Sequence, residues 1–152
     1  MSAETDLIKL YSGRILAMAA NMPRTGRLTA PDATVTKRSP LCGSTVTVDV
    51  EMDDGRVADY AQDVKACALG QAAAAVVGEA AIGRTPAELR AGADALRAML
   101  KDNGPVPAEP WTGFEVLEPA RDYRNRHASI MLAIEALTEA AEAADTRTDL
   151  PA

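Results

Sequence analysis

Residues 44–83 read STVTVDVEMDDGRVADYAQDVKACALGQAAAAVVGEAAIG, and the change of pattern inside this stretch decides the fold. In its first nine residues, three valines and a methionine alternate with polar residues, which predicts a half-buried strand. Asp54-Gly55 predicts a hairpin turn, because that turn requires positive φ angles, so residues 56–64 should return as a second strand. From residue 66 the stretch is alanine-rich and helix-prone, and Gly83 suits the end of a helix.

Upstream of this stretch, the sequence predicts one more strand and one helix. Residues 32–38 (DATVTKR) are the predicted first strand of a three-stranded antiparallel meander. Residues 5–20 carry apolar side chains at near-helical spacing, with Thr5 or Asp6 as the cap. The following NMPRTG, residues 21–26, contains a proline and a glycine and should end that helix.

Downstream, the signals are helical. Thr85, Pro86 and Glu88 form a capping-box signature, which places a helix start at Pro86. Residues 103–113 contain three prolines and two glycines and are predicted to form a loop. Residues 120–144 are predicted to form a last long helix with one apolar stripe.

The order of these elements predicts the fold class. One helix, three strands and then helices indicate an α+β protein, with a three-stranded antiparallel sheet and helices packed on one face. A chain of 152 residues with 47% hydrophobic residues suits one domain. We expect that domain to cover residues 1–145 and residues 146–152 to form a flexible tail.

The charge pattern disfavours several classes of function. The formal net charge is −6 and no dense Lys/Arg face is evident, which argues against nucleic-acid binding. No apolar run reaches the roughly 18 residues of a membrane span, so no membrane association is expected. The N-terminus lacks a secretory signal pattern. With two cysteines expected to stay reduced, these features predict a cytoplasmic protein.

Both cysteines are expected at the ends of elements, where a thiol is accessible. Cys42 follows Pro40 in the loop before the second strand, and Cys67 opens the helix after the third strand. A helix N-terminus favours negative charge, and the thiolate is the form that binds metal and attacks sulfur. His127 is the single histidine. Two cysteines and a histidine suit zinc or an iron–sulfur cluster, although isolated cysteines are more often small buried hydrophobes.

Other chemistry is weakly indicated. Phosphate-binding glycine loops and a GxSxG nucleophile elbow are missing from the sequence. Asp53-Asp54 is better explained as a turn than as a catalytic acid pair. The cluster of Arg121, Arg124 and Arg126 is either a charged helix face or a contact for an anionic partner.

In order and context, these motifs resemble the U-type iron–sulfur cluster assembly scaffolds, the IscU/SufU family that includes the N-terminal domain of NifU. The segments that carry the resemblance are Met22-Pro-Arg-Thr-Gly26, Asp32-Ala33, Pro40-Leu-Cys-Gly-Ser44, Ala66-Cys67-Ala-Leu-Gly-Gln-Ala-Ala73 and Gly83-Arg-Thr-Pro-Ala-Glu88. The resemblance covers nearly the whole chain. Residues 101–121 are similar to the extra segment of the SufU branch, and the chaperone-recognition Leu-Pro-Pro-Val-Lys of the IscU branch is absent.

The resemblance implies a scaffold, not necessarily an enzyme, that accepts sulfur from a cysteine desulfurase and passes a cluster to acceptor proteins. Its implied ligands are Cys42, Cys67 and His127, holding an Fe–S cluster, [2Fe–2S] first, or Zn²⁺. In one register His127 stands at the family's third cysteine. In another it matches the family histidine and Ala128 stands at the cysteine. Cys42 and Cys67 are the candidate persulfide acceptors.

Two departures from the family pattern leave alternatives open. Ser44 replaces the aspartate after Cys-Gly and is a poor ligand unless deprotonated, although it remains a candidate fourth ligand. The third cysteine is missing, so water, an outside thiol or a partner's side chain would complete the coordination. The alternatives to a cluster scaffold are a zinc-holding sulfurtransferase partner of a desulfurase and a degenerate member that kept the fold as a binding module.

Overall fold

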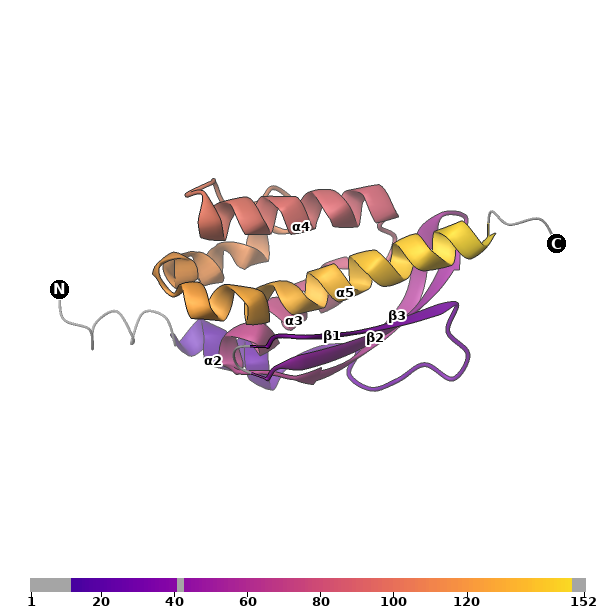
Figure 1. Cartoon of the computed structure of the whole chain (residues 1–152), viewed down its shortest axis with the longest axis horizontal. Coiled ribbons are helices and arrows are strands. Elements are labelled where there is room, and N and C mark those ends of the chain that lie inside the picture. Colours follow the sequence, from indigo (N-terminus) through magenta and orange to yellow (C-terminus); the bar gives the residue numbers. More distant parts are fainter. Residues whose placement is uncertain (1–11, 41–42, 149–152) are drawn as a thin grey trace.

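The computed structural model describes residues 12–40 and 43–148, and Figure 1 labels its elements. The three strands form one sheet in the order β1-β2-β3, and both pairs are antiparallel. The elements are α2 (Gly13–Ala20), β1 (Ala33–Arg38), β2 (Thr45–Asp53), β3 (Arg56–Lys65), α3 (Ala68–Ala80), α4 (Pro86–Lys101), the 3-10 helix η1 (Thr112–Asp122) and α5 (Arg124–Thr148). The predicted meander and α+β class are confirmed.

The β2–β3 hairpin turns where the sequence predicts. Asp54 and Gly55 have φ angles of 53° and 75°, the positive values that such a turn needs. The register changes between Glu51 and Met52, which marks a bulge next to the turn. This local chemistry fixes which residues of β2 and β3 lie opposite each other.

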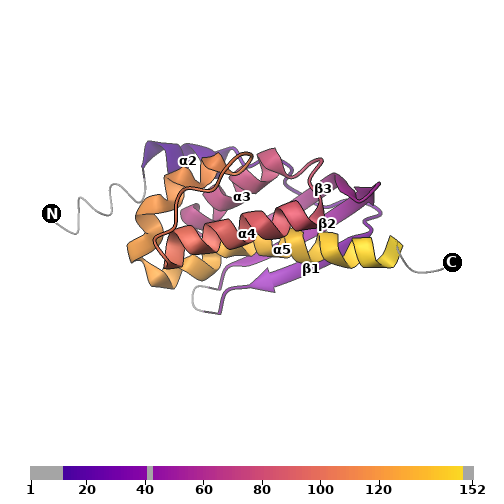
Figure 2. The same cartoon turned by 90° about the horizontal axis from the view of Figure 1, so that it is seen from above.

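The helices lie in two layers over one face of the sheet (Figures 1 and 2). α5 runs across β1 and β2 with α3 beside it, and α2 packs against α3. α4 covers the outer side of α5, away from the strands. Within the described residues, no helix is long and apolar enough to cross a lipid bilayer.

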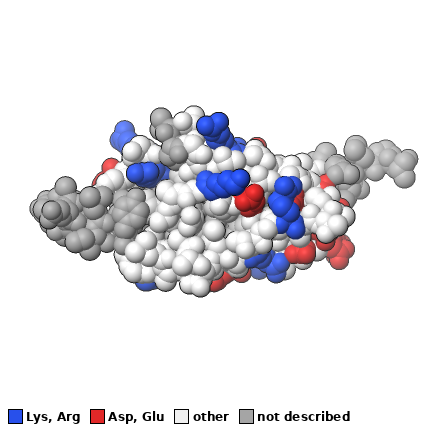
Figure 3. Space-filling model, turned by 90° about the horizontal axis from the view of Figure 1, so that it is seen from below, with Lys and Arg blue, Asp and Glu red and all other residues white. Residues whose placement is uncertain are grey.

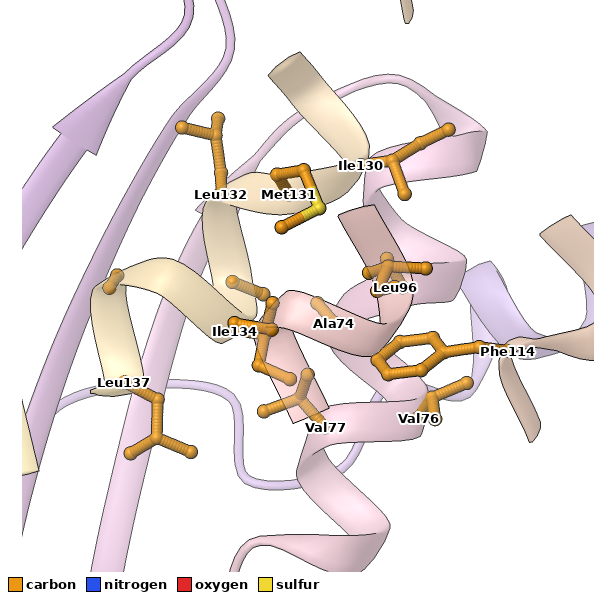
Figure 4. Close-up of a cluster of buried hydrophobic side chains, with 14 of the residues drawn as sticks. Ala74, Val76, Val77, Leu96, Phe114, Ile130, Met131, Leu132, Ile134 and Leu137 are labelled. Atoms are coloured by element: carbon orange, nitrogen blue, oxygen red, sulfur yellow. The ribbon is translucent and has the colours of Figure 1, made fainter. Parts of the chain in front are cut away.

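The core lies between these layers. Figure 4 shows side chains of α3, α4, η1 and α5 meeting in one apolar cluster. Val46, Val48 and Val50 of β2 are buried on the same side of the sheet, as the alternation predicts. Many of the buried residues of α3 and α5 are alanines, which lets the helices approach the sheet closely.

The opposite face of the sheet is also partly covered, which the sequence did not predict. The alternation places Asp49 on the solvent side, but its side chain is fully buried. The segment before β1 covers it, and Asp49 accepts hydrogen bonds from the Arg27 guanidinium, the Leu28 amide and the Thr34 hydroxyl. Figure 3 shows the rest of this face, with separate Lys and Arg side chains on a largely uncharged surface.

The ends of two helices differ from the prediction. Ser12 caps α2 by accepting from the Ile15 amide, so this helix starts at Gly13, and residues 5–11 of the predicted helix over 5–20 lie outside the described part. Thr85 and Glu88 form the predicted capping box at the start of α4, with reciprocal bonds of 3.1 Å.

The last long helix begins later than predicted. Residues 112–122 form η1, and α5 starts at Arg124 instead of residue 120. Pro119 lacks an amide donor and lies inside η1, and Tyr123 leaves helical geometry with φ −113° and ψ 72°. The predicted loop of residues 103–113 therefore ends in a short helix whose Phe114 and Leu117 enter the core.

Candidate functional site

Cys67 lies where the sequence places it, between the end of β3 and the start of α3. It is the N-cap residue of α3, with an extended backbone of φ −67° and ψ 170°. Its side chain is half-buried, so the sulfur is supported by the protein but accessible from outside. The predicted position of this thiol at an element end is therefore correct.

Ser129 of α5 joins Cys67 to the loop between β1 and β2. Its hydroxyl oxygen lies 3.6 Å from Cys67 Sγ and 3.0 Å from Ser44 Oγ. Ser129 and Ser44 are both buried. The three side chains come from α5, from the start of α3 and from the loop before β2, so the fold brings three distant stretches of sequence to one point.

Gly70 makes this approach possible. A Cβ atom at position 70 would lie 2.8 Å from Ser129 Oγ and 2.8 Å from Ala66 Cβ. Both distances are shorter than packed atoms tolerate, so a side chain in the first turn of α3 would push Ser129 away from Cys67. Gly70 and Ala66 are small, so α5 can approach the start of α3 and bring the Ser129 hydroxyl against the Cys67 sulfur.

Cys42 lies outside the described residues, but the residues flanking it are well placed. The Ser39 amide donates to the Ser44 carbonyl at 2.8 Å, and the Gly43 amide donates to the Ser39 carbonyl at 2.9 Å. Gly43 has φ 70°, a value that a side chain rarely permits. These bonds close the loop that carries Cys42 at the end of the sheet next to Ser129.

His127 lies on a different side of α5. Its ring is 4% exposed, and Nε2 donates to the Ala120 carbonyl at 2.9 Å. Residues two apart on a helix point in nearly opposite directions, so His127 faces away from Ser129. Within the described residues, no group of three His, Cys, Asp or Glu side chains gathers as a metal site. The structure thus brings together Ser44, Cys67 and Ser129, while His127 lines a separate pocket.

The Met22–Gly26 segment docks along the edge of β3 near this end of the fold. Arg24 has φ 59°, and its carbonyl accepts from the Gln62 amide at 2.9 Å. The Gln62 side-chain amide donates to the Pro23 carbonyl and to Ala74 of α3. Gly78 allows Pro23 to approach, since a Cβ there would lie 2.5 Å from Pro23 Cγ. This motif therefore ties the N-terminal segment to β3 and α3.

The comparisons agree with this fold. Residues 10–147 match the family described as NifU-like N terminal domain. The chain belongs to this family of iron–sulfur cluster assembly scaffolds. The crystal structure of a nitrogen-fixing NifU-like protein (N-terminal) from Brucella abortus is 46% identical, with a TM-score of 0.90, over 93% of this chain and 99% of that one.

More distant structures share the fold. A hypothetical protein is 25% identical with a TM-score of 0.78, over 89% of this chain and 98% of its own. A protein described as an iron–sulfur cluster assembly scaffold for the SUF system of Fervidobacterium islandicum AW-1 is 19% identical. Its TM-score is 0.79, over 88% of this chain and 98% of that one. No match was found among curated proteins.

Sequence reasoning missed the role of Ser129. The residue stands in the apolar stripe of α5, directly before Ile130, and a serine at such a position would usually be expected to bond to its own helix backbone. Its position two residues after His127, one of the ligands that the resemblance implies, was the available signal.

Proposed function

We propose that this protein is an iron–sulfur cluster assembly scaffold or carrier that accepts sulfur from a cysteine desulfurase and holds a transient cluster at the Cys67 end of the sheet. The proposed ligands are Cys42, Cys67 and His127. The observation that carries the proposal is the half-buried Cys67 at the N-cap of α3, in a chain that belongs to the scaffold family. The cluster is cargo that must also leave, and a half-exposed ligand suits such exchange.

The connectivity of the chain limits the distance between Cys42 and Cys67. Ser44 Oγ and Cys67 Sγ both contact the hydroxyl of Ser129. Cys42 precedes Ser44 by two residues in the sequence, and two residues of chain span at most about 7 Å. This connectivity supports a shared site for the two thiolates.

Sulfur receipt requires a thiolate at one of these cysteines. In the proposed step, the thiolate of Cys42 or Cys67 attacks the terminal sulfur of a persulfide on the desulfurase. A new S–S bond forms as the old one breaks, and the desulfurase cysteine leaves as a thiolate. Cys67 Sγ lies at the N-terminus of α3 and contacts the Ser129 hydroxyl, which fixes the position of the sulfur for this attack.

His127 needs a rearrangement to serve as the third ligand. Its Nε2 is occupied by the bond to Ala120 and the ring is buried away from Ser129. Ligation through either ring nitrogen would require the first turn of α5 to shift, because the ring faces away from Ser129 and Cys67. In the other register of the family resemblance, Ala128 stands at the cysteine and an outside group supplies the ligand.

The second candidate function is a zinc-holding sulfurtransferase partner of a desulfurase. It is favoured by Ser44, because the hydroxyl that replaces the family's aspartate contacts Ser129 and contributes no carboxylate. Two thiolates and an imidazole would leave an open fourth position, as transfer sites on zinc do. Stoichiometric zinc in the purified protein, with a persulfide on one cysteine, would favour this function. Absence of tight binding of iron or zinc would favour the third candidate, a binding module without a cluster.

Anaerobic reconstitution with iron and sulfide tests the main proposal. We expect the wild-type protein to develop visible absorption, and Cys42→Ala, Cys67→Ala and His127→Ala to lose it. Asn125→Ala changes an exposed residue of the same helix turn and is the control that should keep the colour. Colour that survives all three ligand substitutions would overturn the assignment.

A further inference from the structure

The end of α4, η1 and the start of α5 lie together at one end of the molecule (Figures 1 and 2). Residues of these three elements line a polar pocket away from Cys67. Its volume is about 590 Å³, which is within the range of small-molecule sites. The charged and polar residues that line it include Lys101, Arg121, Asp122, Arg124 and His127. The proposed scaffold function makes no use of this pocket beyond the buried ring of His127.

The charge in the pocket is opposite to that of the whole chain. Three cations, Lys101, Arg121 and Arg124, face one acid, Asp122, whereas the full sequence carries a net charge of −6. Among the described residues, neither Lys101 nor Arg124 forms an ion pair or a side-chain hydrogen bond. Two cations that lack a protein partner in a shared hollow favour an anionic ligand.

Arg121 is fixed at the wall of this pocket. Its Nε donates to the Met99 carbonyl at 2.8 Å, and Nη2 donates to the Gly104 carbonyl at 2.6 Å. Met99 lies in the last turn of α4, where carbonyl groups lack helix partners and carry partial negative charge. The positive charge of Arg121 therefore offsets the partial negative charge at the C-terminal end of α4, which would otherwise repel an anion.

The opposite wall is the first turn of α5. This helix is 25 residues long and starts at Arg124, so the partial positive charge of its N-terminus adds to the charge of Arg124. His127 is 4% exposed and lines the pocket. Its Nε2 donates to the Ala120 carbonyl, which holds the imidazole ring against the end of η1.

We propose that this pocket binds a phosphate group, either as inorganic phosphate or on a small phosphate ester. Phosphate offers negative oxygens both to the Lys101 ammonium and to the planar fork of the Arg124 guanidinium. The proposal depends on the shape and charge of the pocket and does not require a cluster at Cys67.

The test measures binding of inorganic phosphate and of glycerol 3-phosphate to the metal-free full chain by calorimetry at constant ionic strength. We expect saturable binding that weakens at least about tenfold in the double variant Lys101→Gln/Arg124→Gln. The matched control is Arg38→Gln/Lys65→Gln, which removes the same charge from two exposed residues flanking Thr45 on the far face of the sheet. This control should bind as the wild type does.

The two ligands distinguish the sources of the phosphate group. Tighter binding of glycerol 3-phosphate assigns the pocket to an ester, and equal or weaker binding assigns it to free phosphate. Equal losses in both double variants would show a diffuse charge effect and overturn the proposal. Binding of succinate as tight as that of phosphate, or absence of saturable binding in the wild type, would also overturn it.

Discussion

At the scale of the residue, the candidate site depends on a hydroxyl that the sequence motifs did not single out. Ser129 Oγ contacts Cys67 Sγ at 3.6 Å and Ser44 Oγ at 3.0 Å, and it is almost completely buried. A hydroxyl that donates to sulfur stabilises the thiolate, which is the reactive form. We therefore regard Ser129 as a positioning residue for Cys67.

Removal of this hydroxyl should slow the chemistry of Cys67. In a Cys42→Ser background, Cys67 is the single thiol, and we expect Ser129→Ala to slow its alkylation by iodoacetamide about fivefold at neutral pH. Ser129→Thr keeps a hydroxyl and should restore most of the rate. Ser44→Ala is the control, since its hydroxyl contacts Ser129 instead of the sulfur. Equal rates in all four proteins would exclude the positioning role.

Asp49 is the second residue whose role only the structure reveals. Its side chain is fully buried on the face of the sheet that the alternation leaves to solvent. Hydrogen bonds from Arg27, together with those from Thr34 and Leu28, lower the pKa of Asp49 from 3.8 to about 2, although burial alone would raise it. The segment before β1 is thereby attached to β2.

This attachment should weaken in acid. Because the pKa of Asp49 is lower in the folded chain, its contribution to stability is complete above about pH 4 and is lost as the pH falls towards 2. We expect Asp49→Asn to lower the free energy of unfolding by about 2 kcal/mol at pH 6, and the gap to the wild type to narrow at pH 2.5. Urea unfolding of both proteins at the two pH values measures this. A gap that stays constant with pH would contradict the account.

At the scale of the element, the parts that local chemistry encodes were predictable. The Asp54-Gly55 turn and the Thr85 capping box each depend on residues within one turn, and both form as expected. The 3-10 helix at residues 112–122 was not predicted, because its proline and glycine content is typical of loops while its stability comes from burial of Phe114 and Leu117. Such tertiary packing cannot be derived from a short stretch of sequence.

At Gly78, helix α3 packs closely against the Met22–Gly26 segment. A Cβ at position 78 would lie 2.5 Å from Pro23 Cγ and 3.0 Å from the Tyr60 hydroxyl, so Gly78→Ala should separate the Met22–Gly26 segment from α3. We expect a loss of about 2 kcal/mol in the free energy of unfolding, measured in urea. Gly13→Ala is the control, because no atom lies within 4 Å of its Cβ position, and it should be neutral or slightly stabilising. Equal stabilities of the two variants would refute this close packing.

At the scale of the whole molecule, α5 connects the parts that function requires. It packs on the sheet, carries Ser129 to Cys67, and brings its first turn to the polar pocket under α4. The position of Cys67 could be predicted, because the strand and helix patterns meet there. That Ser129 would contact it, and that His127 would face the other side of α5, could not be predicted, because both depend on where a late helix crosses an early sheet. The family resemblance predicted the fold, but it did not predict which residues of α5 would face Cys67.

The central claim is that Cys67 holds the cargo of the scaffold, and a thiol footprint tests it most directly. Wild-type protein is reconstituted anaerobically with iron and sulfide, and the alkylation rate of the peptide that contains Cys67 is compared with that of the metal-free protein by mass spectrometry. We expect Cys67 to be protected in the loaded protein and to regain its full rate once a chelator removes the iron. An unchanged rate at Cys67 in protein that is fully loaded would contradict the account.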